Sequence, residues 1–225
     1  MRLWLVRHAD PDYASDALTP KGHVQARLLA EALLSAPIDA FYVSPLGRAQ
    51  LTARYTLERR GASAETLEWL AELRGAYAPG HVAWDMHGVA VLSGDEPITV
   101  DAWPDQAVYG QQLLPVLRRF WQAWDRFCGE RGYVRNAQRY RVLRHTDDQL
   151  AFFCHAGVIL SLLAHLLHIP PPLVYAHFGC DPSSITILET DEADGWATFR
   201  LVVANDMSHA PGLRRSPQEN ARYGF

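Results

Sequence analysis

The sequence predicts an α/β fold in which helices cover a largely parallel sheet. Short apolar segments, such as residues 3–6 and 40–43, have no polar face and are typical of buried strands. Segments with apolar residues at helical spacing, such as residues 24–33, lie between them. Strands that alternate with helices are typical of parallel sheets, because each crossover helix packs on a face of the sheet.

Two helix starts near the N-terminus are marked by a hydroxyl residue followed by proline. Thr19-Pro20 and Ser44-Pro45 both have this pattern, in which the hydroxyl caps the helix and the proline enters its first turn. The predicted elements in this part are a strand at 3–6, a helix from 19–20 to 33, a strand at 40–43, a helix from 44–45 to about 61, and a weaker strand at 67–70.

The middle of the chain is irregular, and regular patterns return after it. Residues 76–104 show no periodicity and contain several Gly and Pro residues, which indicates an insertion or lid. The elements predicted after it are a helix at 108–127, strands at 139–143 and 149–153, a helix at 157–167, and strands at 184–188 and 198–203. The turn-forming residues 146–148 predict a hairpin between the first two of these strands. Prolines 170–172 are expected to stop the helix before them.

Composition places the chain among ordinary globular proteins. Of its 225 residues, 48% are hydrophobic and 20% are charged, which excludes disorder over the whole chain. The length predicts one domain over residues 1–210, with an insertion or lid at about 76–147 and a polar tail at 211–225. The formal net charge is −4, whereas proteins that coat nucleic acid carry a basic excess, so no nucleic-acid partner is expected.

Cysteine usage and hydropathy predict where the protein resides. Cys128, Cys154 and Cys180 are odd in number and have no CxxC spacing, which indicates reduced thiols. The apolar run at residues 3–6 is too short for a signal-peptide core or a membrane span. We therefore expect a cytoplasmic protein without a membrane partner, and a homodimer stays an open alternative.

Charged and nucleophilic side chains follow several of the predicted strands. Ligands of parallel sheets bind beyond the carboxyl ends of the strands, so residues at these ends are expected to meet in one pocket. They are Arg7 and His8 after the first strand, Arg48 in the first turn of the second helix, Glu72 after the third strand, and His155 after the strand at 149–153. The sequence therefore predicts a pocket that contains two arginines, two histidines and a carboxylate.

This set of side chains suits phosphoryl transfer. The planar fork of an arginine matches phosphate oxygens, and the helix starts near Arg48 and Gly157 add positive partial charge. A neutral histidine nitrogen can attack phosphorus, and a carboxyl group can protonate the leaving oxygen. Because side chains supply the positive charge, this chemistry requires no metal ion and no other cofactor.

Several motifs together resemble the histidine phosphatase superfamily, which includes the cofactor-dependent phosphoglycerate mutases. The motifs are Leu5-Val6-Arg7-His8, Leu18-Thr19-x-x-Gly22-x-x-Gln25-Ala26, Ser44-Pro45-Leu46-x-Arg48-Ala49-x-x-Thr52-Ala53, Leu70-x-Glu72, Cys154-His155-Ala156-Gly157 and Asn205-Asp206-x-x-His209. They lie within residues 1–75 and 149–210. The resemblance implies a phosphoglycerate mutase-like three-layer α/β/α sandwich, whose sheet is mostly parallel with one antiparallel edge strand.

The resemblance also implies a role for each candidate residue. His8 would be the nucleophile that becomes phosphohistidine, while Arg7, Arg48 and His155 would bind the phosphoryl group. Glu72 would be the general acid and then the base for water. The predicted function is a metal-independent phosphomonoesterase that acts on a small phosphorylated metabolite. The alternatives are a phosphoglycerate mutase-type phosphoryl transfer and a phosphate-binding protein without turnover.

The chain departs from the family pattern beside the nucleophile and after the acid. Ala9 stands where glycine is usual, and Asp10 stands where glutamate is common. Gly75 follows Glu72 one position early. Asp10 either caps its loop or replaces Glu72 as the proton donor, and both alternatives stay open.

Some residues outside the motifs also carry expectations. Arg144-His145 is a second Arg-His pair, which is expected on the surface of the hairpin. Arg214 and Arg215 in the tail are expected to be solvated. Specificity is expected in the insertion, because loops around a rigid sheet carry recognition. Aromatic residues that are expected to offer apolar faces to the substrate are Tyr77, Trp84, Trp103 and Tyr109.

Overall fold

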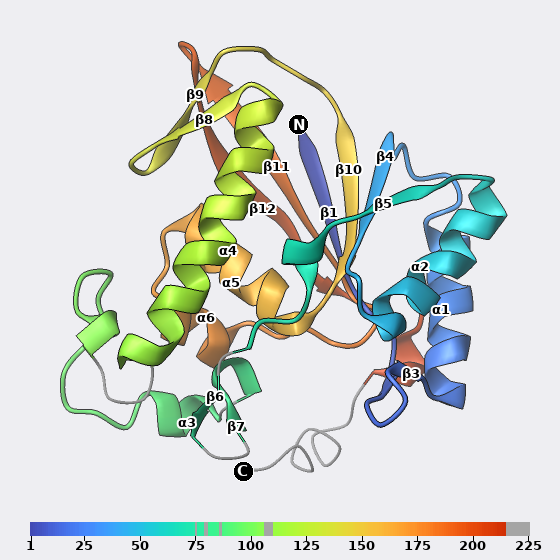
Figure 1. The fold of residues 1–225 in the computed structure, drawn as a ribbon, viewed down its shortest axis with the longest axis horizontal. Coiled ribbons are helices and arrows are strands. Elements are labelled where there is room, and N and C mark those ends of the chain that lie inside the picture. The colour runs from blue at the N-terminus through green and yellow to red at the C-terminus, as the bar shows by residue number, and fades with distance from the viewer. Residues whose placement is uncertain (75, 79–80, 86, 106–109, 215–225) are drawn as a thin grey trace.

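A central sheet organises the fold. The computed structural model describes residues 1–74, 76–78, 81–85, 87–105 and 110–214, and in this part of the chain eight strands form the sheet. In spatial order they are β5 (Ala64–Thr66), β4 (Ala40–Val43), β10 (Gln149–Cys154), β1 (Arg2–Arg7), β11 (Ile185–Ala193), β12 (Trp196–Asp206), β9 (Arg139–Val142) and β8 (Tyr133–Asn136). The strands β5, β4, β10 and β1 are all parallel, so their carboxyl ends lie along one edge (Figure 1).

The predicted α/β class with a mostly parallel sheet is confirmed. Beyond β1 the neighbouring strands pair antiparallel, from β11 through β12 and β9 to β8. Among the described strands only β11 and β9 therefore run against the common direction. Both lie inside the sheet, so the expectation of one antiparallel strand at the edge is wrong in that detail.

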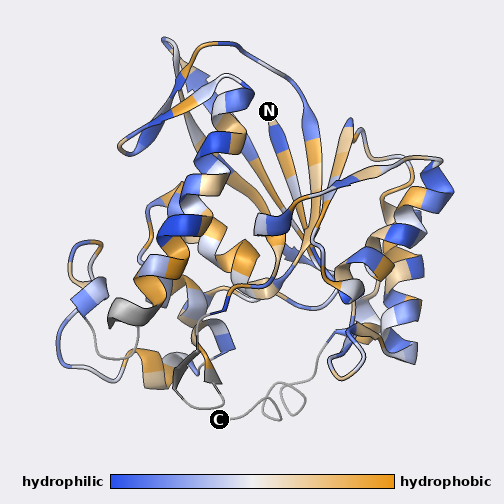
Figure 2. Ribbon diagram, in the orientation of Figure 1, coloured by the Kyte–Doolittle hydropathy of each residue, from blue (hydrophilic) through white to orange (hydrophobic). Residues whose placement is uncertain are grey.

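Helices cover both faces of the sheet, which gives three layers (Figure 1). α1 (Pro20–Ala32) and α2 (Gly47–Arg60) lie on one face, and α4 (Gly110–Glu130), α5 (Ala156–Leu167) and α6 (Pro171–His177) lie on the other. Successive residues of a strand face opposite sides. Leu5 accordingly belongs to the same buried cluster as Phe152 and Trp124, while Val6 belongs to the cluster of Leu29. The hydropathy colouring shows the apolar strands enclosed between the helical layers (Figure 2).

The predicted hairpin between residues 139–143 and 149–153 is wrong. β9 pairs with β8, which the sequence analysis missed, and with β12. β10 lies between β4 and β1, and the connection from β9 crosses over the sheet to reach it (Figure 1). The reason is burial, because β10 is apolar on both faces and needs a strand on each side and a helix layer above and below.

The position of proline relative to the helix end differs among the three predicted helix boundaries. Thr19 caps α1 as predicted, since its Oγ1 accepts a hydrogen bond from the Gly22 amide at 3.0 Å. The second helix begins at Gly47, two residues later than the predicted start at Pro45, because the hydroxyl of Ser44 is engaged elsewhere. The run at 170–172 does end α5, but Pro171 also opens α6, because proline is tolerated in a first turn.

The third strand was predicted three residues too late. The strand β5 covers Ala64–Thr66, and Glu68–Leu70 forms a short 3₁₀ helix. β5 is the edge strand of the sheet and its side chains are largely exposed, so it has no apolar signal. Leu70 supplies the apolar signal instead, since it is buried in the core.

Short elements connect β5 to α4. They are β6 (Ala76–Ala78), β7 (His81–Val82), a 3₁₀ turn at Ala83–Asp85, α3 (Gly88–Val91) and a 3₁₀ turn at Trp103–Asp105. Trp84 and Trp103 are both buried, so they do not present the open apolar faces that the sequence analysis expected. Tyr77 lies in β6, and Tyr109 lies outside the described residues.

The start of the tail is attached to the fold. Arg214 is exposed, as predicted, but its guanidinium lies 3.3 Å from the carboxylate of Asp181 and donates to the carbonyl of Asn205 at 3.1 Å. Gln25 donates to the carbonyl of Leu213 at 3.0 Å. Arg215 lies outside the described residues. Among the helices of the described part, none is long and apolar enough to cross a membrane.

Gly22 is expected to be essential for the packing of α1. A Cβ at this position would lie 2.2 Å from the carbonyl oxygen of Asp10, which is backbone and cannot turn away. Gly22→Ala should therefore lower the free energy of unfolding by about 1–3 kcal/mol, the range of overpacking. Gly129→Ala in α4 is the matched control, because no atom lies within 4 Å of its added Cβ and the change should stabilise by up to about 1 kcal/mol. Urea unfolding measures both, and equal effects would contradict this account.

Candidate active site

The carboxyl ends of three parallel strands bring the predicted residues together. Arg7 ends β1 and His8 follows it, Ser44 follows β4, and His155 follows β10. The amide of His8 donates to the carbonyl of Cys154 at 2.9 Å, which continues the β1–β10 ladder by one residue. The ring centroids of His8 and His155 are 5.1 Å apart. Both histidines are fully buried, so each ring is held in one place.

The contacts of His8 define which of its nitrogens carries the proton. Nδ1 lies 2.8 Å from the carbonyl of Ala9, which can only accept, so Nδ1 is the donor. Nε2 accepts from Nε of Arg48 at 3.4 Å, so the lone pair of Nε2 points toward this arginine. Burial and then the charge of Arg7 lower the pKa of His8 well below its ordinary value, so the imidazole is neutral at pH 7.

Arg48 is held by a residue that the sequence analysis missed. Asp16 forms an ion pair with the guanidinium of Arg48, and its other carboxylate oxygen accepts from the amide of Gly47 at 2.6 Å. It thereby caps α2, the role that was predicted for Ser44. Asp16 lies just before β3 (Ala17–Leu18), which pairs with β2 (Pro11–Asp12), and it adopts φ +48°. The ring of Tyr13 lies 5.4 Å from the guanidinium carbon of Arg48, at the exposed side.

Arg7 and His155 each have a buried side-chain nitrogen without a hydrogen-bond partner among the described residues. Arg7 donates from one terminal nitrogen to the carbonyl of Cys180, while its Nε has no acceptor. His155 has Nε2 at 2.7 Å from the hydroxyl of Ser44, while its Nδ1 has no partner. Buried polar atoms without partners are costly in a folded chain, so they are typical of a site that receives a ligand.

Ser44 sets the orientation of His155. Its Oγ accepts from the amide of Leu46 at 3.2 Å, so its hydroxyl hydrogen is available for Nε2 of His155. When this hydroxyl donates to Nε2, the neutral ring carries its proton on Nδ1. Burial, followed by the charges of Arg48 and Arg7, lowers the pKa of His155 to about 2, so the ring is neutral. His155 can then offer an N–H to an anionic oxygen without carrying a charge.

Glu72 lies over the start of α5. Its carboxylate accepts from the amide of Leu73 at 3.0 Å and from that of Gly157 at 3.4 Å. Burial raises its pKa to about 7, although those hydrogen bonds and the charge of Arg7 act in the opposite direction. A Cβ on Gly157 would lie 2.6 Å from both Oε1 of Glu72 and Cε2 of Trp84, so the glycine lets both side chains approach the start of α5. A carboxyl group with this pKa can both give and take a proton near pH 7.

Asp10 is engaged in the loop after His8. Its carboxylate accepts from the hydroxyl of Thr19 at 2.7 Å, and its amide donates to Gln25 at 2.7 Å. Of the two alternatives for Asp10, this geometry favours the cap. Ala9 is fully buried and does not have a positive φ. Its amide donates to the hydroxyl of Thr52 at 2.9 Å. Its backbone therefore does not need the glycine that is usual here.

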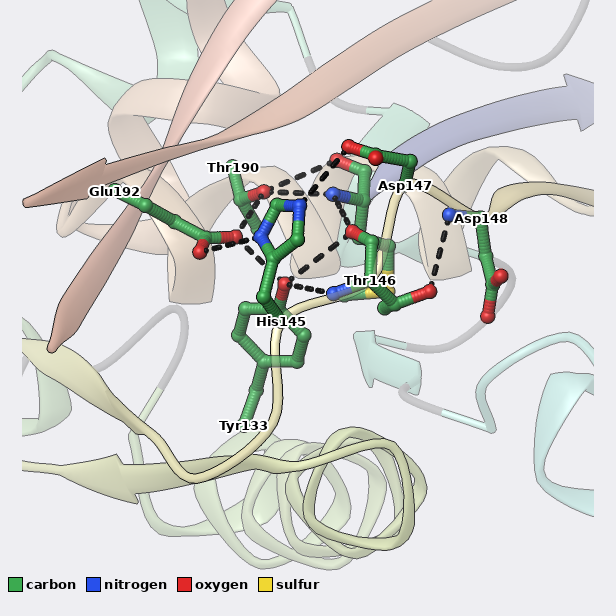
Figure 3. Close-up of polar contacts among 8 residues, drawn as sticks. Tyr133, His145, Thr146, Asp147, Asp148, Thr190 and Glu192 are labelled. Carbon is green, nitrogen blue, oxygen red and sulfur yellow. Dashed lines mark hydrogen bonds and ion pairs between the residues drawn. The ribbon is translucent and has the colours of Figure 1, made fainter.

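The second Arg-His pair lies at the other end of β1, in an opposite electrostatic environment. His145 is exposed, and its ring nitrogens lie 2.9 Å from Glu192 and 3.1 Å from Asp147 (Figure 3). These carboxylates raise its pKa, Glu192 first, whereas burial and arginine lower the pKa of His8. The expectation that Arg144-His145 is a surface pair is confirmed, although it lies on the crossover to β10 and not on a hairpin.

The site as a whole matches a tetrahedral anion. Arg7 and Arg48 supply positive charge, and the buried His155 supplies a neutral donor. Among the residues that the structure describes, no group of three or more His, Cys, Asp or Glu side chains is placed to hold a metal ion. The structure brings together all five residues that the sequence predicted, and adds Asp16 and Ser44 as their supports.

Comparison with known proteins identifies the family. Residues 3–204 match the histidine phosphatase superfamily (branch 1), and the chain belongs to this family. It is 29% identical over 214 residues to the adenosylcobalamin/alpha-ribazole phosphatase of Salmonella typhi, and this alignment covers 90% of this chain and 96% of the relative. It is 25% identical over 206 residues to phosphoserine phosphatase 1 of Hydrogenobacter thermophilus, which covers 85% of this chain and 88% of the relative.

A solved structure supports the fold. Mycobacterial glucosyl-3-phosphoglycerate phosphatase in complex with inorganic phosphate superposes with a TM-score of 0.65 at 22% identity, over 93% of this chain and 99% of that chain. The predicted phosphoglycerate mutase-like fold and the resemblance to this superfamily are confirmed. Membership of a family whose matched relatives are phosphatases also confirms the predicted enzyme class, a phosphoric monoester hydrolase.

Proposed function

We propose that the protein is a metal-independent phosphomonoesterase that acts through a phosphohistidine at His8. The observation that carries this proposal is the position of Nε2 of His8. Its ring is neutral, Nδ1 holds the proton against the carbonyl of Ala9, and Nε2 lies 3.4 Å from Nε of Arg48. A phosphoryl group bound to that arginine would have its phosphorus next to an available lone pair.

The first half of the reaction transfers the phosphoryl group to the enzyme. Nε2 of His8 forms a bond to phosphorus while the bond from phosphorus to the ester oxygen breaks. Arg7, Arg48 and the Nδ1–H of His155 hold the three other oxygens, where negative charge accumulates. The carboxyl group of Glu72 gives its proton to the leaving oxygen, so the alcohol departs neutral.

The second half restores the enzyme. The carboxylate of Glu72 takes a proton from water, whose oxygen attacks phosphorus as the bond to Nε2 of His8 breaks. Inorganic phosphate leaves, and Glu72 is again protonated for the next cycle. A pKa of about 7 suits both directions of proton transfer, because neither form of the carboxyl group is scarce at that pH.

The substrate that we propose is a small phosphate monoester of an alcohol. The relatives act, by their names, on alpha-ribazole phosphate and phosphoserine, and these esters share an alkyl oxygen as leaving group. An alkoxide is a poor leaving group, so such a substrate needs the proton that Glu72 supplies.

Release of inorganic phosphate tests this function. The protein is incubated with phosphoserine, alpha-ribazole phosphate, glycerol 2-phosphate and p-nitrophenyl phosphate in the presence of EDTA. We expect release of inorganic phosphate from at least one ester. With a radiolabelled ester and an alkaline quench, which preserves the acid-labile bond between phosphorus and histidine, we expect labelled phosphate on His8. Isomerisation of phosphoglycerate without phosphate release would instead indicate a mutase. Vanadate binding without turnover of any ester would indicate a phosphate-binding protein.

A further inference from the structure

We propose that Trp84 is a positioning residue for Glu72, whose indole shields the carboxyl group from water and so keeps its proton available for the leaving oxygen. This inference rests on the proposed role of Glu72 as general acid. It adds a residue from the irregular segment between Glu72 and α4, which carries none of the family motifs, to the proton-transfer machinery.

Gly157 shows that the indole and the carboxyl group are neighbours. A Cβ built on this glycine would lie 2.6 Å from Oε1 of Glu72 and also 2.6 Å from Cε2 of Trp84. Both side chains therefore occupy the space directly above the first turn of α5. The amide of Gly157 donates to Oε2 of Glu72, so the backbone holds one oxygen of the carboxyl group while the indole lies near the other.

The indole is itself fixed in place. Trp84 is only 6% exposed, and it lies in the 3₁₀ turn at Ala83–Asp85 next to the fully buried Ala83. Its ring meets that of Tyr175 edge-on at 6.4 Å, and the Tyr175 hydroxyl bonds that of Ser161 on α5 at 2.8 Å. A large apolar ring that is anchored in this way can exclude water from one side of Glu72.

Exclusion of water is the effect that Glu72 needs. Two amides and the positive charges of Arg7 and Arg48 favour its ionised form, yet its pKa is raised to about 7, with burial as the largest cause. Cys154, Cys180 and Tyr175 also interact with Glu72, and burial raises their own pKa values, so they are neutral at pH 7. Among the leading causes only burial raises this pKa, while the hydrogen bonds and the arginine charges lower it, so cover from water accounts for the shift.

The test is the pH dependence of phosphoryl transfer to the enzyme. It is followed in single turnover with glycerol 2-phosphate for wild type, Trp84→Phe, Trp84→Ala and Glu72→Gln. Wild type should lose activity as pH rises through about 7, because the acid must be protonated. Trp84→Ala should move this loss to lower pH by about one unit. Trp84→Phe should move it by less, because the phenyl ring still covers part of the carboxyl group.

Trp103→Phe is the matched control, because Trp103 is also buried and lies in the same segment, whereas the atoms nearest to a Cβ on Gly157 belong to Glu72 and Trp84. It should leave the pH profile unchanged. A lower rate with an unshifted profile in both Trp84 variants would overturn the inference and leave a packing role. If Glu72→Gln kept the wild-type loss near pH 7, the proposed role of Glu72 itself would fail, and this outcome is distinct from the first. Trp84→Phe keeps the test valid if Trp84→Ala does not fold.

Discussion

His8→Ala should lower kcat/KM for any phosphomonoester substrate by at least about 10⁴-fold, which is the usual size of the loss of activity when a catalytic nucleophile is removed. Nε2 of the buried ring lies 3.4 Å from Nε of Arg48, and an alanine leaves no atom to bond phosphorus. The neighbouring Arg48 and His155 would still bind phosphate, so vanadate affinity should fall far less than turnover. Phosphate release and vanadate titration measure the two effects separately.

The chain contains its own control for this experiment. His145→Ala removes the histidine of the second Arg-His pair, which is exposed and paired with carboxylates at the opposite end of β1. It should retain wild-type turnover and the phosphohistidine label. Substantial activity in His8→Ala, or loss of the label in His145→Ala, would show that the nucleophile has been assigned to the wrong residue.

The pocket could be predicted from the sequence because strand direction determines it. His8 and His155 each come directly after a strand with a buried carboxyl-terminal half, and Arg7 is the last residue of the first of these strands; the two strands are parallel and central in this fold. Once two strands are parallel, their carboxyl ends meet at one edge, whatever lies elsewhere in the chain. Local pattern was therefore sufficient for these residues.

Asp16 could not be predicted in this way, because its role depends on packing between distant segments. A single aspartate between turn residues is typical of a loop cap, and nothing local indicates that it reaches Arg48. One signal was present in Gly47 at the start of α2. A Cβ there would lie 2.3 Å from the carbonyl of Asp16, so the glycine marks a close approach of two backbones. The sequence alone does not say which segment approaches.

The error in strand pairing has a similar cause. Residues 146–148 are turn-forming, and proximity along the chain favours a hairpin, but β10 is buried on both faces and β9 is not. β10 buries five of its six residues, so it belongs in the middle of the sheet, where helices cover both faces. The burial pattern of the strand was therefore a better guide to its neighbours than the turn beside it.

Glu72→Gln should lower kcat for glycerol 2-phosphate by about 10²–10⁴-fold, the usual contribution of a positioned general acid. The amide keeps the shape, and its single carbonyl oxygen can still accept from one of the two backbone amides, Leu73 or Gly157, that donate to the two oxygens of Glu72, so phosphate binding should be preserved. It carries no ionisable proton, and the leaving alkoxide must then depart without one. The wild-type loss of activity through about pH 7 should disappear from the single-turnover profile.

The nature of the leaving group separates acid catalysis from every other role of Glu72. p-Nitrophenolate is stable as an anion, so the step that forms phosphohistidine from p-nitrophenyl phosphate needs little protonation. Glu72→Gln should therefore slow the burst of p-nitrophenol far less than it slows transfer from glycerol 2-phosphate. The later hydrolysis of phosphohistidine should be slow with both esters, because the base for water is missing. An equal loss in the transfer step for both esters would contradict acid catalysis, and would indicate that Glu72 acts by positioning the phosphoryl group.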